Sequence, residues 1–517
     1  MKITFLTEEW TQSTKGSCST FMRQMAIELS RLENVEIGIL IPSASPEDKE
    51  DAQKYNINVF EPEKLTGYEP VDCLQFPPQG FSTDFIIGQG IKPGCHGQVL
   101  KNNLGCKWVH VVLRNAEETA MFQKTPGAIS EGQKQYETEV ELCKKADMVI
   151  TVGSKLNETF NSALHHCKKD HIFNLTPGIF DEFFGEQKQY RNSKNFKILV
   201  FGRGNTEDFE LKGLHVAAKA VAHLNKYESS YILKVVGAPE GEQEKLAERL
   251  EDLGISRSQL IVRSFYTERG KLAQLFFEVD LVLMPSGTEA FGLAALEALS
   301  AGVPILITHN SGLAEALEEI PFGRRCIVDQ ADDWADQIKQ ARKHLRTGLV
   351  EASTLRNNYK EKYCWMDQCA AFVMKLRALH SGHAEEMQQE SQGKRHSAQK
   401  RVADPAKDSD QSASKRDFSS VSGKRLKEGV VTDDDLQTLG KAIGVKWDRL
   451  ARRLPGIKEE DIEEIEDSRK TLSERGFHML KLWRTNNGKA ADYKTLYNAL
   501  VHELVQRRDL AEKYCFE

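Results

Sequence analysis

The chain has 517 residues, of which 40% are hydrophobic, and its formal net charge is −6 at pH 7. At roughly 100–200 residues per domain this length predicts a multidomain protein, and the acidic balance favours no nucleic-acid partner. The chain has no apolar run near the ~18 residues of a membrane span, and its ten cysteines include no C-x-x-C pair.

The beginning of the chain, "MKITFLTEEW", has an apolar run too short for a signal peptide. Scattered cysteines are typical of free thiols in a reducing compartment. We therefore expect a cytoplasmic protein with no metal site.

Residues 1–380 alternate helix-like segments with short runs that are rich in Val and Ile. These runs are "KITFL", "VEIGILI", "DFIIG", "KWVHVVL", "DMVITVG", "FKILVFG", "YILKVVG", "LIVRSF", "DLVLMP" and "VPILIT". Continuous apolar runs of this kind are typical of parallel strands buried on both faces, and their alternation with helices predicts doubly wound sheets. The polar stretch "GEQKQYRNSKN" divides the zone. We predict two Rossmann-like α/β domains, residues 1–190 and 195–380, facing a cleft at the carboxyl ends of their strands.

The stretch "MPSGTEAFGLAALEALSAGVPIL" follows a strand of the second domain and opens a helix. The N–H groups of Phe291, Gly292 and Leu293 then lie at the helix N-terminus, where they favour a phosphate. Glu289 precedes the helix and Glu297 lies about two turns inside it, and both carboxylates could accept hydrogen bonds from sugar hydroxyls. Alternatively, Glu289 caps the helix and Glu297 is a solvated flank residue.

Two cations lie near the end of the first strand of the second domain, in "VFGRGNTEDFELKGLHVAAKA". Arg203 follows that strand and Lys212 precedes the next helix, so both could reach a diphosphate in the cleft. The strand-end loops 234–241 and 262–268 could hold the base of a nucleotide.

Together, "FGRG", "LKG", "VVGAPEG", the 284–306 stretch and "NSGLAEAL" resemble the donor-binding domain of family 4 retaining glycosyltransferases of the GT-B fold. The resemblance implies a nucleotide-diphosphate sugar as donor, transfer with retention, and neither a cofactor nor an essential metal. It implies that Glu289 holds the transferred sugar, Glu297 the ribose, and Arg203 with Lys212 the leaving diphosphate. Residues 355–376 would form a terminal helix that crosses back to the first domain.

The first domain matches that family less fully. The loop after its first strand, "TEEWTQSTKGSCST", holds Gly16 without a second glycine. The family often ends a middle strand with a histidine near the reacting centre, but by register Leu113 occupies that position. His110, three residues earlier, and His96, in an expected loop, are weak candidates, and a core role for His110 is the stronger interpretation.

Residues 381–428 are rich in Ser, Gln, Lys, Asp and Arg and predict a disordered linker, because they cannot bury enough apolar surface to offset the entropy of ordering. Four Lys-Arg pairs could act as a nuclear-import signal, although a solvated linker is the simpler interpretation.

Residues 430–515 have helical periodicity, and predict a bundle of about six helices. Its repeating apolar positions are Leu436, Leu439, Ile443, Trp447, Leu450, Leu454, Phe477, Leu480, Trp483, Leu496, Leu500 and Leu504. The elements "W-x-x-LARRL", "MLKLW" and "TLYNAL" resemble a death domain. The resemblance implies homotypic assembly with other death-domain proteins.

Charged side chains on two sides of this module suit head-to-tail assembly, and an ordinary solvated surface is the alternative for each one. These side chains are Arg452 and Arg453 on one side, and Glu459, Glu460, Asp461, Glu463 and Glu464 on the other.

Two hypotheses follow for the whole chain. The first is a retaining, metal-independent glycosyltransferase coupled to death-domain signal transduction. The second is a weak or inactive glycosyltransferase-like scaffold that acts as a death-domain adaptor. A hydrolase of phosphosugars is less favoured, because no His/Asp metal cluster is visible.

Overall fold

The computed structural model describes residues 1–11, 17–165, 167, 171–183, 193–205, 207–266, 268–330, 333–397, 427, 429–443, 447–468, 472–502, 505, 507–516. The chain separates into two compact units, Met1–His396 and Ser397–Glu517. Each unit has its own hydrophobic core. Among the described residues, no helix has the length and apolar character needed to cross a membrane.

The first unit begins with a seven-stranded sheet in the order β3-β2-β1-β4-β5-β6-β7, whose pairings are parallel throughout the described residues. Its strands are Lys2–Leu6 (β1), Glu36–Leu40 (β2), Asn58–Phe60 (β3), Phe85–Gln89 (β4), Lys107–Val112 (β5), Met148–Val152 (β6) and Ile172–Leu175 (β7). Its helices are Ser17–Ser30 (α1), Pro46–Lys54 (α2), Ile91–Leu104 (α3), Ala116–Ala120 (α4), Ala128–Lys145 (α5) and Ser154–Ala163 (α6).

A second, six-stranded parallel sheet follows in the order β10-β9-β8-β11-β12-β13. Its strands are Phe196–Phe201 (β8), Tyr231–Ala238 (β9), Leu260–Ser264 (β10), Leu281–Met284 (β11), Ile305–Thr308 (β12) and Ile327–Val328 (β13). Its helices are Asp208–Leu211 (α7), Leu214–Asn225 (α8), Gln243–Glu251 (α9), Arg269–Glu278 (α10), Leu293–Ser300 (α11), Gly312–Glu318 (α12), Trp334–Lys343 (α13) and Leu345–Lys362 (α14).

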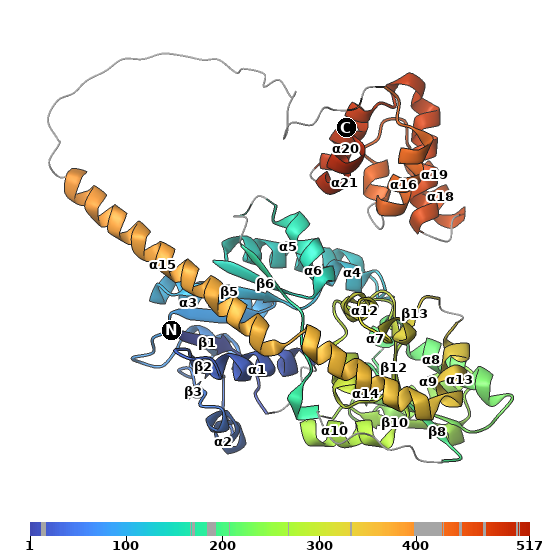
Figure 1. Cartoon of the computed structure of the whole chain (residues 1–517), viewed down its shortest axis with the longest axis horizontal. Helices are drawn as coiled ribbons and strands as arrows, with labels where there is room; N and C mark the ends of the chain where they lie inside the picture. The colour runs from blue at the N-terminus through green and yellow to red at the C-terminus, as the bar shows by residue number, and fades with distance from the viewer. Residues whose placement is uncertain are drawn as a thin grey trace. The chain divides into compact units, whose positions relative to one another are not determined.

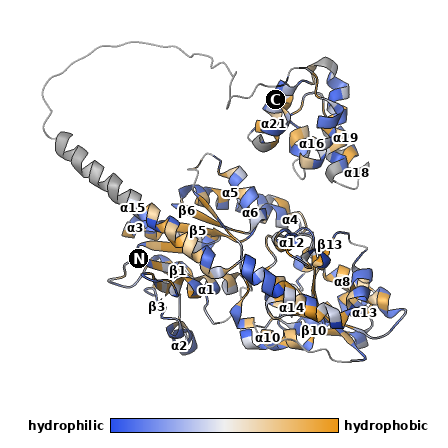
Figure 2. Ribbon diagram, in the orientation of Figure 1, coloured by the Kyte–Doolittle hydropathy of each residue, from blue (hydrophilic) through white to orange (hydrophobic). Residues whose placement is uncertain are grey.

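The two doubly wound sheets confirm the predicted pair of Rossmann-like halves (Figure 1). We call them the N-half, which ends with β7, and the C-half, which begins with β8. Figure 2 shows hydrophobic residues along β1, β5 and β6 and hydrophilic residues on α2, as expected for strands covered on both faces. The strand order reverses between β1 and β4 and between β8 and β11, and such switch points are where ligands bind.

The last helix of the first unit, Trp365–Ser397 (α15), returns from the C-half to the N-half (Figure 1). The predicted single helix 355–376 is wrong in its bounds, because α14 ends at Lys362 and α15 begins at Trp365. Trp365 is 6% exposed and its Nε1 donates to the carbonyl of Ile179 at 3.1 Å. The Gln368 side chain bonds both backbone groups of Thr176 just after β7, at 2.9 and 2.8 Å. The crossing helix is therefore fixed to the N-half by its first turns.

Helix α15 continues to Ser397, within the segment predicted as the linker. Ala, Glu, Met and Gln in this stretch have high helix propensity, so a segment with few apolar residues can still extend an existing helix. Residues 398–426 lie outside the described residues.

The described part of the second unit holds α-helices Asp433–Ile443 (α16), Trp447–Ala451 (α17), Glu459–Ser468 (α18), Leu472–Asn487 (α19), Tyr493–Val501 (α20) and Arg508–Tyr514 (α21). Trp447 and Trp483 are 3% and 0% exposed, as expected for core residues. A Cβ added at Gly440 would lie 2.6 Å from the Cα of Phe477, so α16 and α19 cross in close backbone contact. The predicted six-helix bundle is confirmed; Leu504 lies outside the described residues.

We expect Trp365→Ala to lower the free energy of unfolding by about 3–5 kcal/mol, because it empties a buried contact with Phe21 and Phe180. Urea denaturation of the full chain, followed by circular dichroism, measures this. Met374→Ala on the same helix is the control, because Met374 is 65% exposed and should change stability by less than about 0.5 kcal/mol. Equal effects of the two substitutions would contradict the docking role of Trp365.

Candidate functional site

A cavity of about 700 Å³ lies at the facing carboxyl edges of the two sheets. Its size is that of a site for a small organic ligand. The N-half contributes, among others, Cys18, Leu113, Arg114, Thr125, Gly127, Ala128, Glu131 and Gln135, and the C-half Arg203, Asn205, Lys212, Phe265, Thr288, Glu289, Phe291, Gly292 and Leu293. The cleft expected from the sequence therefore exists, and both halves line it.

The loop between β11 and α11 forms one wall of this cavity. Gly292 is the N-cap of α11 and adopts φ +106°, a left-handed conformation that favours glycine. A Cβ at Gly292 would also lie 2.7 Å from the Cε of Met284. Phe291, Gly292 and Leu293 all line the cavity, so the N-terminus of α11 lies at its wall.

Glu289 lies in that loop and forms an ion pair with Lys212. Its Oε1 accepts hydrogen bonds from Lys212 Nζ at 2.7 Å and from Ser286 Oγ at 2.8 Å. Burial lowers the pKa of Lys212, but the charge and hydrogen bond of Glu289 outweigh burial, so the pKa is raised above the ordinary lysine value. Lys212 is therefore a cation at neutral pH.

The glycine of the "LKG" element explains why Lys212 can reach Glu289. Gly213 adopts φ +64°, and a Cβ there would lie 1.9 Å from the carbonyl oxygen of Pro285. Only glycine lets the backbone after α7 approach the loop after β11 this closely. The two segments, some seventy residues apart in the chain, are brought together by this contact.

Arg203 follows β8, is exposed, and lines the same cavity. Arg203, Lys212 and Glu289 therefore line one cavity, and the roles predicted for them stay predictions. Gly16 lies outside the described residues.

Cys18, two residues beyond Gly16, also lines the cavity, although sequence reasoning did not single it out. Burial raises the pKa of its thiol, whereas the positive charges of Lys212, Arg114 and Arg203 lower it without overcoming burial. Three cations, one of them from the N-half, therefore lie near enough to the Cys18 thiol to influence its pKa.

Lys155 is a further residue that the sequence analysis missed. It lies in the first turn of α6, and its Nζ donates to Thr288 Oγ1 and Asn310 Oδ1, both at 2.8 Å. The same ammonium pairs with Glu118 of α4 at 2.8 Å, and Thr288 Oγ1 donates to Glu118 at 2.7 Å. A lysine directly after a strand end, in "VGSKL", is the signal that could have revealed it.

Neither candidate histidine lines the cavity. His110 is fully buried in β5, with its Nε2 2.7 Å from Glu139 Oε1 of α5, so it is a core histidine. His96 lies inside helix α3 rather than in the expected loop, is 7% exposed, and faces Asp72 at 3.5 Å. The loop prediction failed because Pro93 is tolerated in the first turn of a helix, where its missing N–H has no partner to lose.

Glu297 is 4% exposed in α11, which makes the solvated-flank alternative wrong. It is not among the residues that line the cavity in this structure. Its predicted contact with a ribose stays a prediction.

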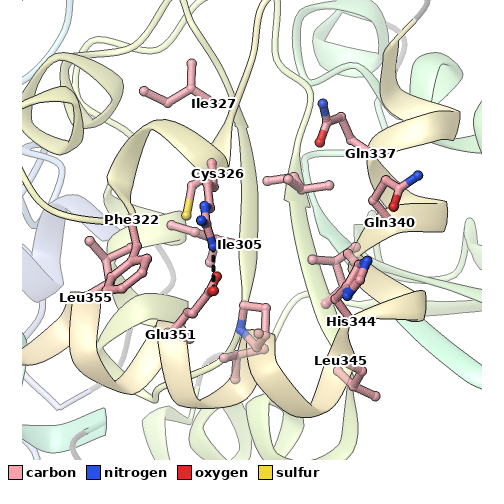
Figure 3. A pocket seen from close by; sticks show the side chains of 18 of the residues that line it. Ile305, Phe322, Cys326, Ile327, Gln337, Gln340, His344, Leu345, Glu351 and Leu355 are labelled. Atoms are coloured by element: carbon pink, nitrogen blue, oxygen red, sulfur yellow. Dashed lines mark hydrogen bonds and ion pairs between the residues drawn. The ribbon is translucent and has the colours of Figure 1, made fainter.

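A second cavity, also about 700 Å³, lies between α13, α14 and β12 of the C-half (Figure 3). Its arginines are neutralised locally, since Arg324 pairs with Asp329 and Arg325 pairs with Glu351. Burial raises the pKa of Cys326 to about 12, so its thiol is protonated. None of the predicted site residues lies here, and the cavity between the halves remains the candidate site.

In the described part of the chain, no three His, Cys, Asp or Glu side chains are grouped so that they could hold a metal ion. The positive charge that faces the cavity comes from Arg114, Arg203 and Lys212.

Residues 4–372 match the family described as Family 4 Glycosyltransferase in conflict systems. The chain belongs to this glycosyltransferase family. Residues 433–514 match the death domain, so the glycosyltransferase region is followed by a death domain in the same chain.

The relatives of the glycosyltransferase region include bacterial enzymes described as D-inositol 3-phosphate glycosyltransferase. The one from Corynebacterium urealyticum is 27% identical over 340 residues, which cover 62% of this chain and 76% of the relative. The one from Paenarthrobacter aurescens is 29% identical over 191 residues, 36% of this chain and 45% of the relative.

Solved structures share the fold of the glycosyltransferase region at low sequence identity. Sucrose-phosphate synthase from Thermosynechococcus elongatus has a TM-score of 0.57 and 16% identity, and covers 74% of this chain and 100% of its own. Anabaena HepE, solved in complex with UDP and glucose, has a TM-score of 0.53 and 18% identity, and covers 73% of this chain and 99% of its own. These likenesses show the shared GT-B arrangement.

We expect Lys155→Met to lower the free energy of unfolding by about 1–3 kcal/mol, because Glu118, Thr288 and Asn310 lose a charged partner at the contact between the halves. Urea denaturation of the full chain measures the loss. Lys144→Met is the matched control, since Lys144 is exposed and pairs only locally with Glu141, a pair that contributes at most about 0.5 kcal/mol. A loss no larger than that of the control would show that Lys155 does not hold the halves together.

Proposed function

We propose that the glycosyltransferase region transfers a sugar from a nucleotide-diphosphate donor with retention of configuration and without a metal ion. The observation that carries the proposal is the convergence of Arg203, the Lys212–Glu289 ion pair and the N-terminus of α11 on one cavity. The neighbour solved with UDP and glucose supports the class of donor.

The C-half would hold the diphosphate of the donor. The N–H groups at the N-terminus of α11 and the two cations, Arg203 and Lys212, supply positive charge where negative charge develops on the leaving group. Such preorganised charge can do the electrostatic work that other enzymes assign to a metal ion.

Glu289 would orient the transferred sugar. Its Oε1 is occupied by Lys212 and Ser286, which fix the carboxylate in place. A fixed carboxylate can accept hydrogen bonds from sugar hydroxyls through its remaining acceptor sites. The bond between the sugar C1 and the phosphate oxygen breaks, the acceptor oxygen bonds to C1 on the same face, and the proton of the acceptor goes to the departing diphosphate.

A second candidate function is that of an inactive scaffold serving as a death-domain adaptor. The observation that favours it lies at the end of β5, where Leu113 rather than a histidine lines the cavity. The only histidine of that strand, His110, is paired with Glu139 in the core.

Calorimetric titration of the full chain with a panel of nucleotide-diphosphate sugars, followed by an assay for release of the nucleotide diphosphate from any donor that binds, separates the two candidates. Binding of one donor, abolished by Glu289→Ala, supports the transferase. If the folded protein binds no donor, the transferase proposal fails and the adaptor remains.

We expect Arg203→Ala to lower the turnover number by about 100-fold or more, while the dissociation constant of the donor changes far less. The reason is that Arg203 would stabilise negative charge that develops on the diphosphate only in the transition state, as the diphosphate leaves. Release of the nucleotide diphosphate, with donor binding measured separately, checks this. Arg346→Ala, at an exposed arginine outside both cavities, is the control. An unaltered turnover number for Arg203→Ala would remove this assignment.

The death domain would couple the enzyme to signal transduction by homotypic assembly. Arg452 and Arg453 are exposed, as are Glu460 and Glu464, whereas Asp461 is half-buried. The side chains of Glu459 and Glu463 lie outside the described part of the unit. Opposed charges on one module support head-to-tail contacts between copies or between related domains.

We expect Arg452→Glu to abolish assembly of the death domain, because it reverses a charge in the basic set and places a second carboxylate beside Asp448, the present partner of Arg452. Light scattering of the full chain across a concentration series measures this. Lys494→Glu makes the same change of charge at an exposed position on α20 and should leave assembly intact. Unchanged assembly of the Arg452 variant would count against this surface.

A further inference from the structure

The wall that the N-half contributes to the cavity carries one arginine, Arg114, directly after Leu113 at the end of β5. Its Nη2 donates to Gln135 Oε1 at 2.7 Å. Gln135 in turn donates from Nε2 to Glu131 Oε1 at 3.0 Å. All three side chains belong to residues that line the cavity, and they form a hydrogen-bonded row along α5.

Arg114 differs from the two lysines of the site, Lys212 and Lys155, in how it is held. Lys212 pairs with Glu289 and Lys155 with Glu118, whereas within the described residues no carboxylate forms an ion pair with Arg114. The neutral amide of Gln135 stands between Arg114 and Glu131. It therefore orients the guanidinium without neutralising its charge.

Arg114 also differs from the cations of the expected diphosphate site in the half of the molecule that carries it. Arg203, Lys212 and the N-terminus of α11 all belong to the C-half, while Arg114 comes from the facing half. An arginine in this setting offers a planar fork that binds phosphate or carboxylate through two parallel hydrogen bonds. Arg114 is exposed, so an acceptor that enters the cavity can reach its guanidinium.

We propose that Arg114 determines acceptor specificity by binding an anionic group, a phosphoryl group or a carboxylate, on the acceptor molecule. The inference rests on the proposed glycosyl transfer, since an acceptor exists only for a transferase. Gln135 acts as the positioning residue that holds Arg114 at the cavity and, being neutral, leaves its positive charge without a compensating carboxylate.

The experiment uses the full chain and the donor found by calorimetry, and follows release of the nucleotide diphosphate with matched acceptors. The probes are glycerol with glycerol 3-phosphate, and glucose with glucose 6-phosphate and glucuronate. We expect kcat/KM at least about tenfold higher for the charged member of a pair, the range of a charge-assisted hydrogen bond. Activity with the phosphates or with glucuronate identifies which anion the site takes.

Substitutions then assign the preference to Arg114. We expect Arg114→Met to reduce the ratio of kcat/KM for charged over neutral acceptors by about tenfold or more, and Arg114→Lys to retain part of it. Gln135→Glu should also reduce the ratio although Arg114 is kept, because a carboxylate in that place neutralises the guanidinium. Arg346→Met, which removes the same charge outside both cavities, should leave the ratio unchanged.

Several outcomes overturn the inference while leaving the proposed function intact. In the first, the protein binds and hydrolyses a donor, but charged acceptors accelerate release of the nucleotide diphosphate no more than their neutral counterparts do. Another is a ratio that Arg114→Met does not change. A third is an Arg114→Met variant that loses affinity for the free nucleotide diphosphate as strongly as Arg203→Ala, because Arg114 would then serve the donor. If no donor binds at all, the proposed function fails, and the acceptor subsite fails with it.

Discussion

The contact between Phe291 and Gly153 joins the two halves of the glycosyltransferase region at the edge of its cavity. Phe291, in the loop between β11 and α11, is 2% exposed. A Cβ at Gly153, directly after β6, would lie 2.5 Å from its ring. An aromatic ring can pack this tightly on the opposite half only because that position has no side chain. The loop that carries Glu289 and the start of α11 is thereby held from both sides.

Lys155 and Gly213 complete this restraint of the loop. Lys155 reaches across from α6 to Thr288 and Asn310, and Gly213 brings the end of α7 against Pro285. Each of these contacts restricts the position of the loop. With the loop held in this way, the carboxylate of Glu289 lies 2.7 Å from the ammonium of Lys212. The pair is thus held in one arrangement by the contacts around its loop.

The positive charges that line the cavity come from both halves. The C-half supplies Arg203 and Lys212, and the N-half supplies Arg114, whose neighbour Gln135 is neutral. The second cavity of the C-half differs in this respect, because its arginines are paired with Asp329 and Glu351. The death domain adds a separate module with its own core around Trp447 and Trp483.

The local sequence determined most of the fold. All ten Val- and Ile-rich runs became strands, because a parallel strand covered on both faces must be apolar throughout. The sequence did not predict β3, β7 and β13. These strands are short and lie at the edges of the sheets, and their apolar runs are correspondingly weaker. Periodicity likewise revealed the helical bundle, and the convergence of Arg203, Lys212 and Glu289 followed from the rule that parallel strands end at one edge.

Only the tertiary structure decided the rest of the site. Arg114, Cys18 and Lys155 come from three separate segments of the N-half, and which side chains of the C-half they face depends on how the two halves pack. His110 and Glu139 lie in different elements, so their pairing depended on how α5 packs on β5. The sequence by itself determined which elements form and which ends of the strands carry charge. The packing of the two halves decided which of those charges share a cavity, because contacts between distant segments arise only when their elements are brought together.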